Sequence, residues 1–232
     1  MSHLASPSEP QNTPSPPAAY LTPFLLLAVM ATLAVMGLAV VTWAPAFAAA
    51  APTASPKPRP TQPAGSQAHL APFFTPEVRH WEADILRWAQ RFHLDPNLVA
   101  TVMQIESCGD PKAVSSAGAR GLFQVMPYHF KDGEDPFNPN TNAQRGLAYL
   151  RQAWQRSGGN VRLTLAGYNG GLGVIGLDSS AWPAETRRYV QWGAPIYQDA
   201  KQGKQNSQAL QTWLQHGGAS LCRQAHQRLG MP

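Results

Sequence analysis

Glu106 is the residue whose type and position best suit acid–base chemistry. It ends an apolar run in which Val99, Val102 and Met103 stand seven, four and three residues earlier, which is the spacing of one helix face. A carboxylate on a buried apolar face is costly to ionise, so burial raises its pKa and keeps it protonated near neutral pH. A protonated carboxyl can act as the general acid that cleaves a glycosidic bond. The alternative is a helix-end Glu that reaches water or pairs with a nearby Arg.

The residues before Glu106 carry the signals of the helix that would position it. Asp95 is a good N-cap residue, and Pro96 suits the first helical position. Gly109 would end the helix in the left-handed conformation that Gly tolerates. The stretch 109–121 is rich in Gly and Ser, so it is expected to be a loop.

The other segments predict a domain built mainly of helices. A short helix over Gly121–Met126 is expected to stop near Pro127. Further helices are expected after the N-cap residue Thr75, at Thr141–Arg156, from Val161 to about Gly167, from Pro183, at Ser207–His216 and at Ala219–Leu229. No strand-like alternation persists and no internal repeat is present, so the predicted fold class is mainly α.

Four short motif blocks follow one another between about residues 105 and 190. They are Glu106-Ser107 with Gly121-Leu122-Phe123-Gln124 and Met126-Pro127, then Asn138-Pro139 with Tyr149-Leu150, then Tyr168-Asn169-Gly170-Gly171, and finally Glu185-Thr186 with Tyr189-Val190. This ordered set resembles the lytic transglycosylases that have the soluble-transglycosylase (SLT) catalytic domain, relatives of goose-type lysozyme. Phe123 stands where the family often has Met, and Gly167 where it often has Ala; neither change removes a reactive group.

The resemblance implies a lysozyme-like domain that cleaves the β-1,4 bond between N-acetylmuramic acid and N-acetylglucosamine in peptidoglycan glycan strands. Glu106 would protonate the leaving oxygen and then, once ionised, deprotonate the muramic 6-hydroxyl. The product would carry a 1,6-anhydromuramic end, and no water would be consumed. No cofactor or metal is implied. The substrate-binding residues implied are Ser116, Gln124, Tyr168, Asn169 and Glu185, with Tyr168 bonded to Glu106 or to the substrate N-acetyl group.

Two other functions remain open at this point. A lysozyme-like muramidase of the same fold would hydrolyse the bond, and it usually needs a second carboxylate. A non-catalytic peptidoglycan-binding module would need no acid. Only Glu106 is placed convincingly, because Asp110 follows Gly109 in the loop.

Cys108 and Cys222 are the two cysteines of the chain. Without a CxxC motif or a Cys/His cluster, they do not indicate a zinc site. An extracytoplasmic domain could join them in a disulfide, and the alternative is two reduced, buried thiols.

The first 72 residues differ in composition from the rest of the 232-residue chain. We expect a disordered segment at 1–23, a transmembrane helix at 24–44 and a Pro/Ala-rich linker at 45–72, before the catalytic domain at 73–232 with its motif core at 95–192. The alternative to a membrane anchor is a secreted protein whose signal is cleaved near Ala48. Either way the domain would be extracytoplasmic, in a bacterial cell envelope.

The formal net charge is +5, and the cations are scattered. This pattern fits a solvated surface or weak attraction to an anionic envelope polymer. No basic run with interleaved aromatics is present, so nucleic-acid binding is not expected.

Overall fold

The computed structural model describes residues 69–232, and this part of the chain is helical without a named strand, as the predicted fold class requires. The α-helices are α1 Pro76–Arg79, α2 Glu82–Phe92, α3 Pro96–Glu106, α4 Pro139–Arg156, α5 Val161–Gly170, α6 Ala184–Lys201, α7 Gln208–Trp213 and α8 Ala219–Leu229. Three 3₁₀ turns, η1 Pro127–His129, η2 Leu172–Gly176 and η3 Ser179–Ala181, and one π turn, η4 Leu214–Gly218, complete them.

The membrane helix predicted at 24–44 lies outside the described residues, as do the segment 1–23 and all of the linker except its last residues. Among the helices from residue 69 onward, none is both long enough and apolar enough to cross a bilayer. Leu70 and Ala71, just before the predicted start of the domain, are already buried in its core.

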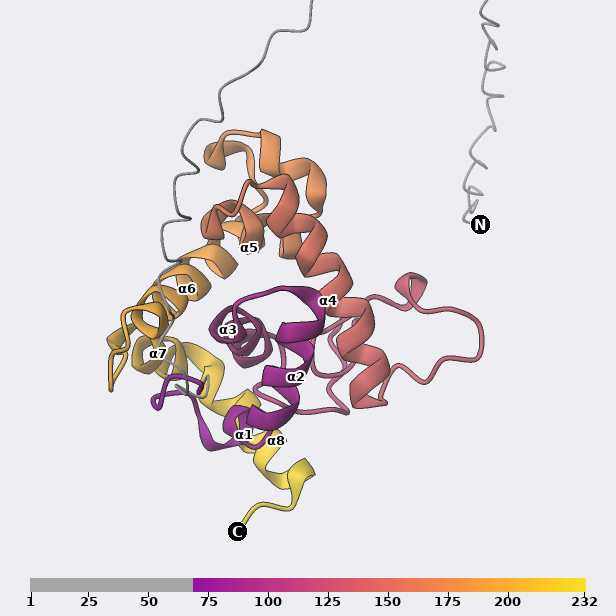
Figure 1. Cartoon of the computed structure of the whole chain (residues 1–232), viewed down its shortest axis with the longest axis vertical. Coiled ribbons are helices and arrows are strands. Elements are labelled where there is room, and N and C mark those ends of the chain that lie inside the picture. The colour runs from indigo at the N-terminus through magenta and orange to yellow at the C-terminus, as the bar shows by residue number, and fades with distance from the viewer. Residues whose placement is uncertain (1–68) are drawn as a thin grey trace, which may run out of the picture. The chain divides into compact units, whose positions relative to one another are not determined.

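Helix α3 lies at the centre of the domain, with the other helices around it (Figure 1). Residues 98–104 are all fully buried. The start of α3 is fixed as its sequence predicts: Asp95 Oδ1 accepts from the Asn97 backbone N–H at 2.8 Å. The Tyr197 hydroxyl of α6 donates to the second carboxylate oxygen of Asp95 at 3.0 Å. Through this side-chain contact, α6 holds the beginning of the helix that carries Glu106.

The first predicted helix is divided into α1 and α2 instead of forming one continuous helix. The Trp81 indole N–H, at the break, donates to the Gly109 carbonyl at 2.9 Å. The Thr75 hydroxyl donates to Gln104 Oε1 at 3.2 Å and does not cap α1. The buried amide of Gln104 needs polar partners, and Thr75 supplies them from the segment that precedes α1.

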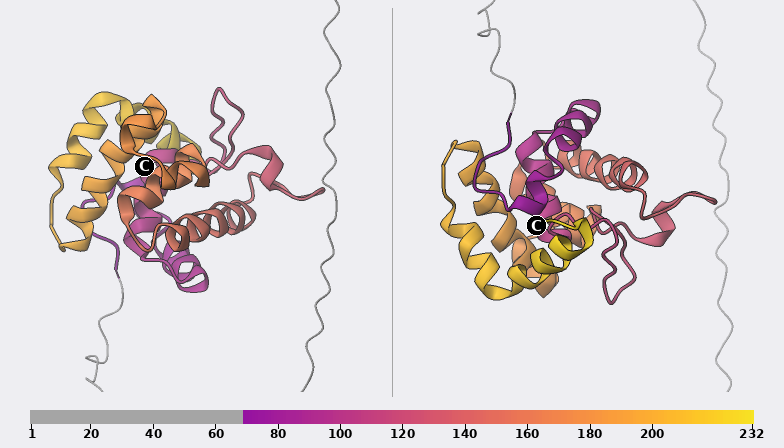
Figure 2. Two further views of the ribbon diagram at one scale, coloured as in Figure 1. Left: turned by 90° about the horizontal axis from the view of Figure 1, so that it is seen from above. Right: turned by 90° about the horizontal axis from the view of Figure 1, so that it is seen from below.

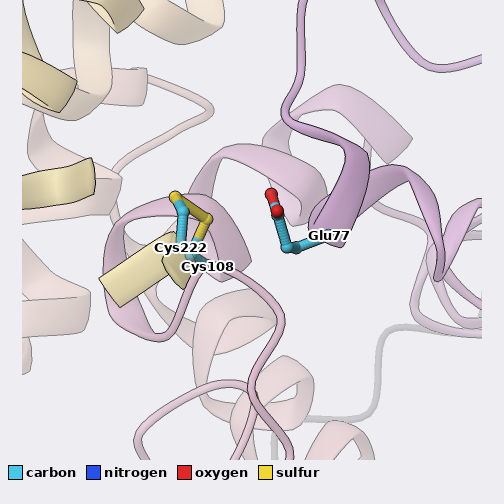
Figure 3. Close-up of side chains that lie close together, drawn as sticks. All are labelled: Glu77, Cys108 and Cys222. Carbon is cyan, nitrogen blue, oxygen red and sulfur yellow. A yellow bond between two sulfur atoms is a disulfide. The ribbon is translucent and has the colours of Figure 1, made fainter. Parts of the chain in front are cut away.

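A disulfide joins Cys108, two residues after Glu106, to Cys222 in α8, with the Cα atoms 5.0 Å apart. Of the two alternatives that the sequence left open, the bridge is the one found. Figure 3 shows the side chain of Glu77 beside it. Since both sulfurs are used in the disulfide, they are not available as thiolate ligands, and this group of three residues is not a metal site as it stands.

The chain leaves α3 through left-handed backbone at Cys108 and Gly109, with φ of 51° and 85°. The left-handed φ predicted for Gly109 is confirmed, but the helix ends earlier, at Glu106, and Cys108 is the first residue after it with positive φ. Gly is also required for space, because a Cβ at this position would lie 2.7 Å from the Glu77 carbonyl oxygen.

The irregular segment between α3 and α4 extends beyond the helices as loops (Figure 2). The prediction of a short helix over Gly121–Met126 is wrong. Residues 121–124 form a tight turn. Two backbone hydrogen bonds between Arg120 and Val125, both 3.0 Å long, close this turn. Gln124 in this turn has φ of 45°, so the backbone pairing has replaced helical geometry.

The later helices are found near their predicted positions, with shifted ends. Helix α4 begins at Pro139, two residues before its predicted start, because Asn138 Oδ1 accepts from two backbone N–H groups, at 3.0 and 3.1 Å. Asn160 caps α5. Helix α5 continues to Gly170, beyond its predicted end near Gly167, and the next residue, Gly171, has φ of 88°.

Candidate active site

Glu106, at the end of α3, faces a cleft of about 540 Å³. The cleft is bounded by the loops between α3 and α4, by α4, by the end of α5 and by the start of α6. Five of the six predicted site residues line it: Glu106, Gln124, Tyr168, Asn169 and Glu185. Ser116 does not; it is exposed, and its neighbours Ser115 and Ala117 line the cleft in its place.

The carboxyl of Glu106 has a pKa raised to about 8. Burial is the main cause, and the negative charge of Glu185 adds to it. The Tyr189 hydroxyl opposes the rise in part by favouring the ionised form. Glu106 keeps partial exposure, and because it lines the cleft it can meet a substrate there. At neutral pH the carboxyl is therefore mostly protonated, as the sequence predicts for an acid on an apolar face.

Tyr189 is a neighbour of Glu106 that the sequence analysis did not identify. Its side chain is 7% exposed, and its hydroxyl makes no hydrogen bond of ordinary geometry to the described residues. It lies close enough to Glu106 for each group to affect the pKa of the other, and the pKa of Tyr189 is itself raised by burial. The signal for it was its position four residues after Glu185, which puts both on one face of α6.

Tyr168 was expected to bond to Glu106 or to the substrate N-acetyl group, and the structure shows no hydrogen bond from it to Glu106. Its hydroxyl donates to the Phe123 carbonyl at 2.7 Å. It therefore holds the turn at 121–124 against the last turn of α5. Burial raises its pKa, and the charge of Glu106 raises it further, so the ring lies near the acid even without a bond to it. A buried backbone carbonyl needs a donor, and that need fixes the direction of the hydroxyl.

Gln124 and Asn169 each use one end of the side-chain amide inside the protein. The Gln124 Nε2 group donates to the carbonyls of Gly121 and Ala113, at 3.0 and 3.3 Å. Asn169 Oδ1 accepts from the Thr186 hydroxyl at 2.9 Å. The fixed ends leave the amide oxygen of Gln124 to accept, and the amide nitrogen of Asn169 to donate, in the cleft that both residues line.

Glu106 and Glu185 are the carboxylates that line the cleft within residues 69–232. Asp110, the acid nearest to Glu106 in sequence, is 3% exposed and accepts from the Lys112 backbone N–H at 2.8 Å. It does not line the cleft, so a second catalytic carboxylate would have to be Glu185.

The cleft floor depends on Gly146 in α4. A Cβ there would lie 2.6 Å from Phe123 Cβ and 3.2 Å from the Tyr168 hydroxyl. We expect Gly146→Ala to destabilise the fold by about 1–3 kcal/mol, the usual cost of overpacking, and to lower activity by displacing the turn that Tyr168 holds. Urea unfolding and a cleavage assay would measure both effects. Gly173→Ala is the matched control, because no heavy atom lies within 4 Å of its added Cβ; equal behaviour of the two variants would contradict the prediction.

The part of the chain that holds this cleft is similar to known proteins. Residues 84–185 match the family model of the transglycosylase SLT domain. A transglycosylase of Enterobacteria phage PRD1 is 36% identical over 111 residues, which cover 47% of this chain and 40% of that protein. A membrane-bound lytic murein transglycosylase C of Edwardsiella ictaluri is 30% identical over 129 residues, covering 46% of this chain and 35% of that protein.

Two more distant matches cover less of the other protein. A soluble lytic murein transglycosylase of Salmonella typhimurium is 29% identical over 101 residues, 38% of this chain and 16% of that protein. The solved structure of an inactive mutant of the lytic transglycosylase Slt from Pseudomonas aeruginosa aligns at 27% identity with a TM-score of 0.44, over 53% of this chain and 24% of that one. This chain thus spans less than half the length of the proteins that it matches.

Proposed function

We propose that this protein is a lytic transglycosylase of peptidoglycan, because residues 84–185 match the family model of the transglycosylase SLT domain. It cleaves the β-1,4 bond between N-acetylmuramic acid and N-acetylglucosamine and forms a 1,6-anhydromuramic end. The observation that carries the proposal is the Glu106 carboxyl, which lines the cleft with a pKa of about 8.

In the first half of the reaction Glu106 is the general acid. It gives its proton to the glycosidic oxygen, so the bond to the anomeric carbon of the muramic residue breaks and the N-acetylglucosamine side leaves as an alcohol. The substrate's own N-acetyl group stabilises the positive anomeric centre. The hydroxyl of Tyr189, which lacks another partner among the described residues, donates to the carboxylate that Glu106 has become.

In the second half Glu106 is the general base. The carboxylate removes the proton of the muramic 6-hydroxyl, whose oxygen closes on the anomeric carbon. One group does both steps, so the enzyme returns to its starting protonation state. A pKa of about 8 suits both halves, because the acid is protonated at neutral pH and its conjugate base is stronger than an ordinary carboxylate.

The other cleft residues bind the glycan. The amide oxygen of Gln124 accepts from a substrate N–H or hydroxyl, and the amide nitrogen of Asn169 donates to a substrate oxygen. Glu185 lies at the exposed side of the cleft, where it accepts from sugar hydroxyls and raises the pKa of Glu106. Tyr168 supports the cleft floor through Phe123.

Cleavage should fall as the pH rises through about 8, where Glu106 loses the proton that it must donate. Glu185→Gln removes a negative charge that raises this pKa, so the alkaline limb should move to lower pH. Initial rates of muropeptide release from purified sacculi, measured against pH, would test both statements. A limb near pH 4 to 5, where an ordinary Glu titrates at about 4.3, would contradict the assignment of the acid.

The rival function is hydrolysis by the same fold, and the presence of Glu185 in the cleft is what favours it. Mass spectrometry of the soluble products from sacculi separates the two. Anhydromuramic ends support the proposal, and reducing muramic ends support a muramidase. Absence of any release would indicate a binding module.

The proposal extends to the location of the protein. Peptidoglycan lies outside the cytoplasmic membrane, so the domain acts in the bacterial cell envelope, anchored by residues 24–44. Several relatives are named membrane-bound lytic murein transglycosylases, and the disulfide fits an oxidising compartment.

A further inference from the structure

Tyr128, in η1, is an exposed aromatic side chain on the wall of the cleft. Its side chain is 75% exposed, and it is one of three large apolar residues that are strongly exposed in the described part; the others are Val114 and Leu177. Of these three, only Tyr128 lines the cleft. Core packing therefore does not account for it, and an exposed ring at a cleft suits a ligand.

The loop that follows Tyr128 is held firmly. Arg145 of α4 makes a two-bond ion pair with Glu134, with Nε to Oε2 at 2.8 Å. The same carboxylate accepts from the Lys131 backbone N–H at 2.9 Å. The Asn142 amide donates to the Pro136 carbonyl at 2.9 Å. The ring of Tyr128 is thus presented by an anchored segment, which lowers the entropy cost of ordering it on binding.

A row of aromatic rings connects Tyr128 to the neighbourhood of the catalytic acid. The ring centroids are 4.5 Å apart from Tyr128 to His129, 5.1 Å from His129 to Tyr149 and 5.9 Å from Tyr149 to Tyr168. All four residues line the cleft. Burial lowers the pKa of His129, which favours the neutral form of this ring. The row begins beside Glu106 and ends at the exposed Tyr128.

We propose that Tyr128 is a stacking platform for a sugar ring of the bound glycan strand, beyond the two sugars that flank the cleaved bond. The inference rests on the proposed function and adds a subsite to it. A pyranose ring presents C–H groups on its faces, and these pack on an aromatic ring and remove it from water, while the hydroxyls around its edge stay solvated. Within the row, Tyr128 stands at the end opposite Tyr168, the ring whose pKa the charge of Glu106 raises, so we assign to Tyr128 a sugar outside the reacting bond.

The test measures binding by calorimetry to two glycan strands without stem peptides, a single disaccharide of N-acetylmuramic acid and N-acetylglucosamine and a strand of four disaccharide repeats. All variants carry Glu106→Gln, so that neither strand is cleaved. Tyr128→Ala should weaken binding of the longer strand about tenfold, which corresponds to about 1.4 kcal/mol, and should leave the shorter strand within about twofold. Tyr128→Phe keeps the ring and should bind as the parent does. Leu177→Ala is the control for loss of an exposed apolar side chain outside the cleft.

Unchanged binding of the longer strand by Tyr128→Ala would overturn the inference and would leave the proposed function intact. Equal weakening for both strands would also overturn it, because it would assign Tyr128 to the sugars at the cleaved bond. If the Glu106→Gln parent bound neither strand, the proposed function would fail on its substrate, and the inference would fail with it. Circular dichroism of each variant would confirm folding.

Discussion

Replacing Glu106 by Gln is expected to abolish cleavage of sacculi while leaving the fold intact. Gln keeps the shape of the side chain, but it can neither give the proton to the leaving oxygen nor take one from the 6-hydroxyl. General acid–base assistance is typically worth about 100- to 10,000-fold in rate, and one group doing both steps should lie toward the upper end. Release of soluble muropeptides, with circular dichroism to check folding, measures the effect.

Glu185→Gln is the matched comparison, because it makes the same chemical change in the same cleft. It should reduce the rate by less, since in the proposed scheme Glu185 binds substrate and raises the pKa of Glu106 but transfers no proton. If Glu185→Gln were as inactive as Glu106→Gln, the single-acid scheme would be wrong and the two-carboxylate hydrolase would be favoured.

The Glu106→Gln variant should also be more stable than the parent at neutral and alkaline pH. The folded pKa of about 8 lies above the ordinary value of 4.5, so the folded state holds the proton more tightly than the unfolded chain. Below pH 4.5 the burial of Glu106 costs no stability, because the carboxyl is protonated in both states. As the pH rises toward 8 the free energy of unfolding falls, because the carboxyl ionises in the unfolded state alone. The difference in free energy of unfolding between variant and parent should therefore increase over this range.

Removing the disulfide is the second change with a large expected effect. Cys108 and Cys222 are 114 residues apart in sequence, so the bridge restricts most of the unfolded domain. The double variant Cys108→Ala and Cys222→Ala should lose about 2–5 kcal/mol in free energy of unfolding. Both side chains are buried, so part of the loss comes from packing at the end of α3.

Urea unfolding with and without a reducing agent provides the control for this prediction. The reductant should destabilise the native protein by a similar amount and should leave the double variant unchanged. A native protein whose unfolding midpoint does not respond to complete reduction would contradict the assigned stabilising role of the bridge.

The sequence predicted the helix that carries the acid because local signals and packing agree there. Asp95, Pro96 and the apolar spacing each favour α3, and the structure buries residues 98–104 on every side, which includes the face that the spacing indicates. Glu106 itself was identified from its position on that face, and its raised pKa follows from the burial. From the sequence alone, a disulfide between the two cysteines and two reduced thiols remained equal alternatives, since pairing depends on how α8 packs against the end of α3.

Other features depended on contacts between distant residues. The turn at 121–124 forms because Arg120 and Val125 pair, and a run with helical composition does not reveal that pairing. The hydroxyl of Tyr168 donates to the Phe123 carbonyl, which is 45 residues away in sequence. Tyr189 became a neighbour of the acid only when α6 packed on α3. Tyr128 gave no signal in sequence, because its exposure in the cleft depends on the loop that Arg145 holds.

Digestion of sacculi in water enriched in heavy oxygen tests the central claim most directly. If Glu106 removes the proton of the 6-hydroxyl, the new muramic ends are 1,6-anhydro rings. Mass spectrometry should then find these ends lighter than reducing ends by one water and free of heavy oxygen. Reducing muramic ends that carry heavy oxygen, formed at the native rate and lost in Glu106→Gln, would contradict the account and identify the protein as a hydrolase.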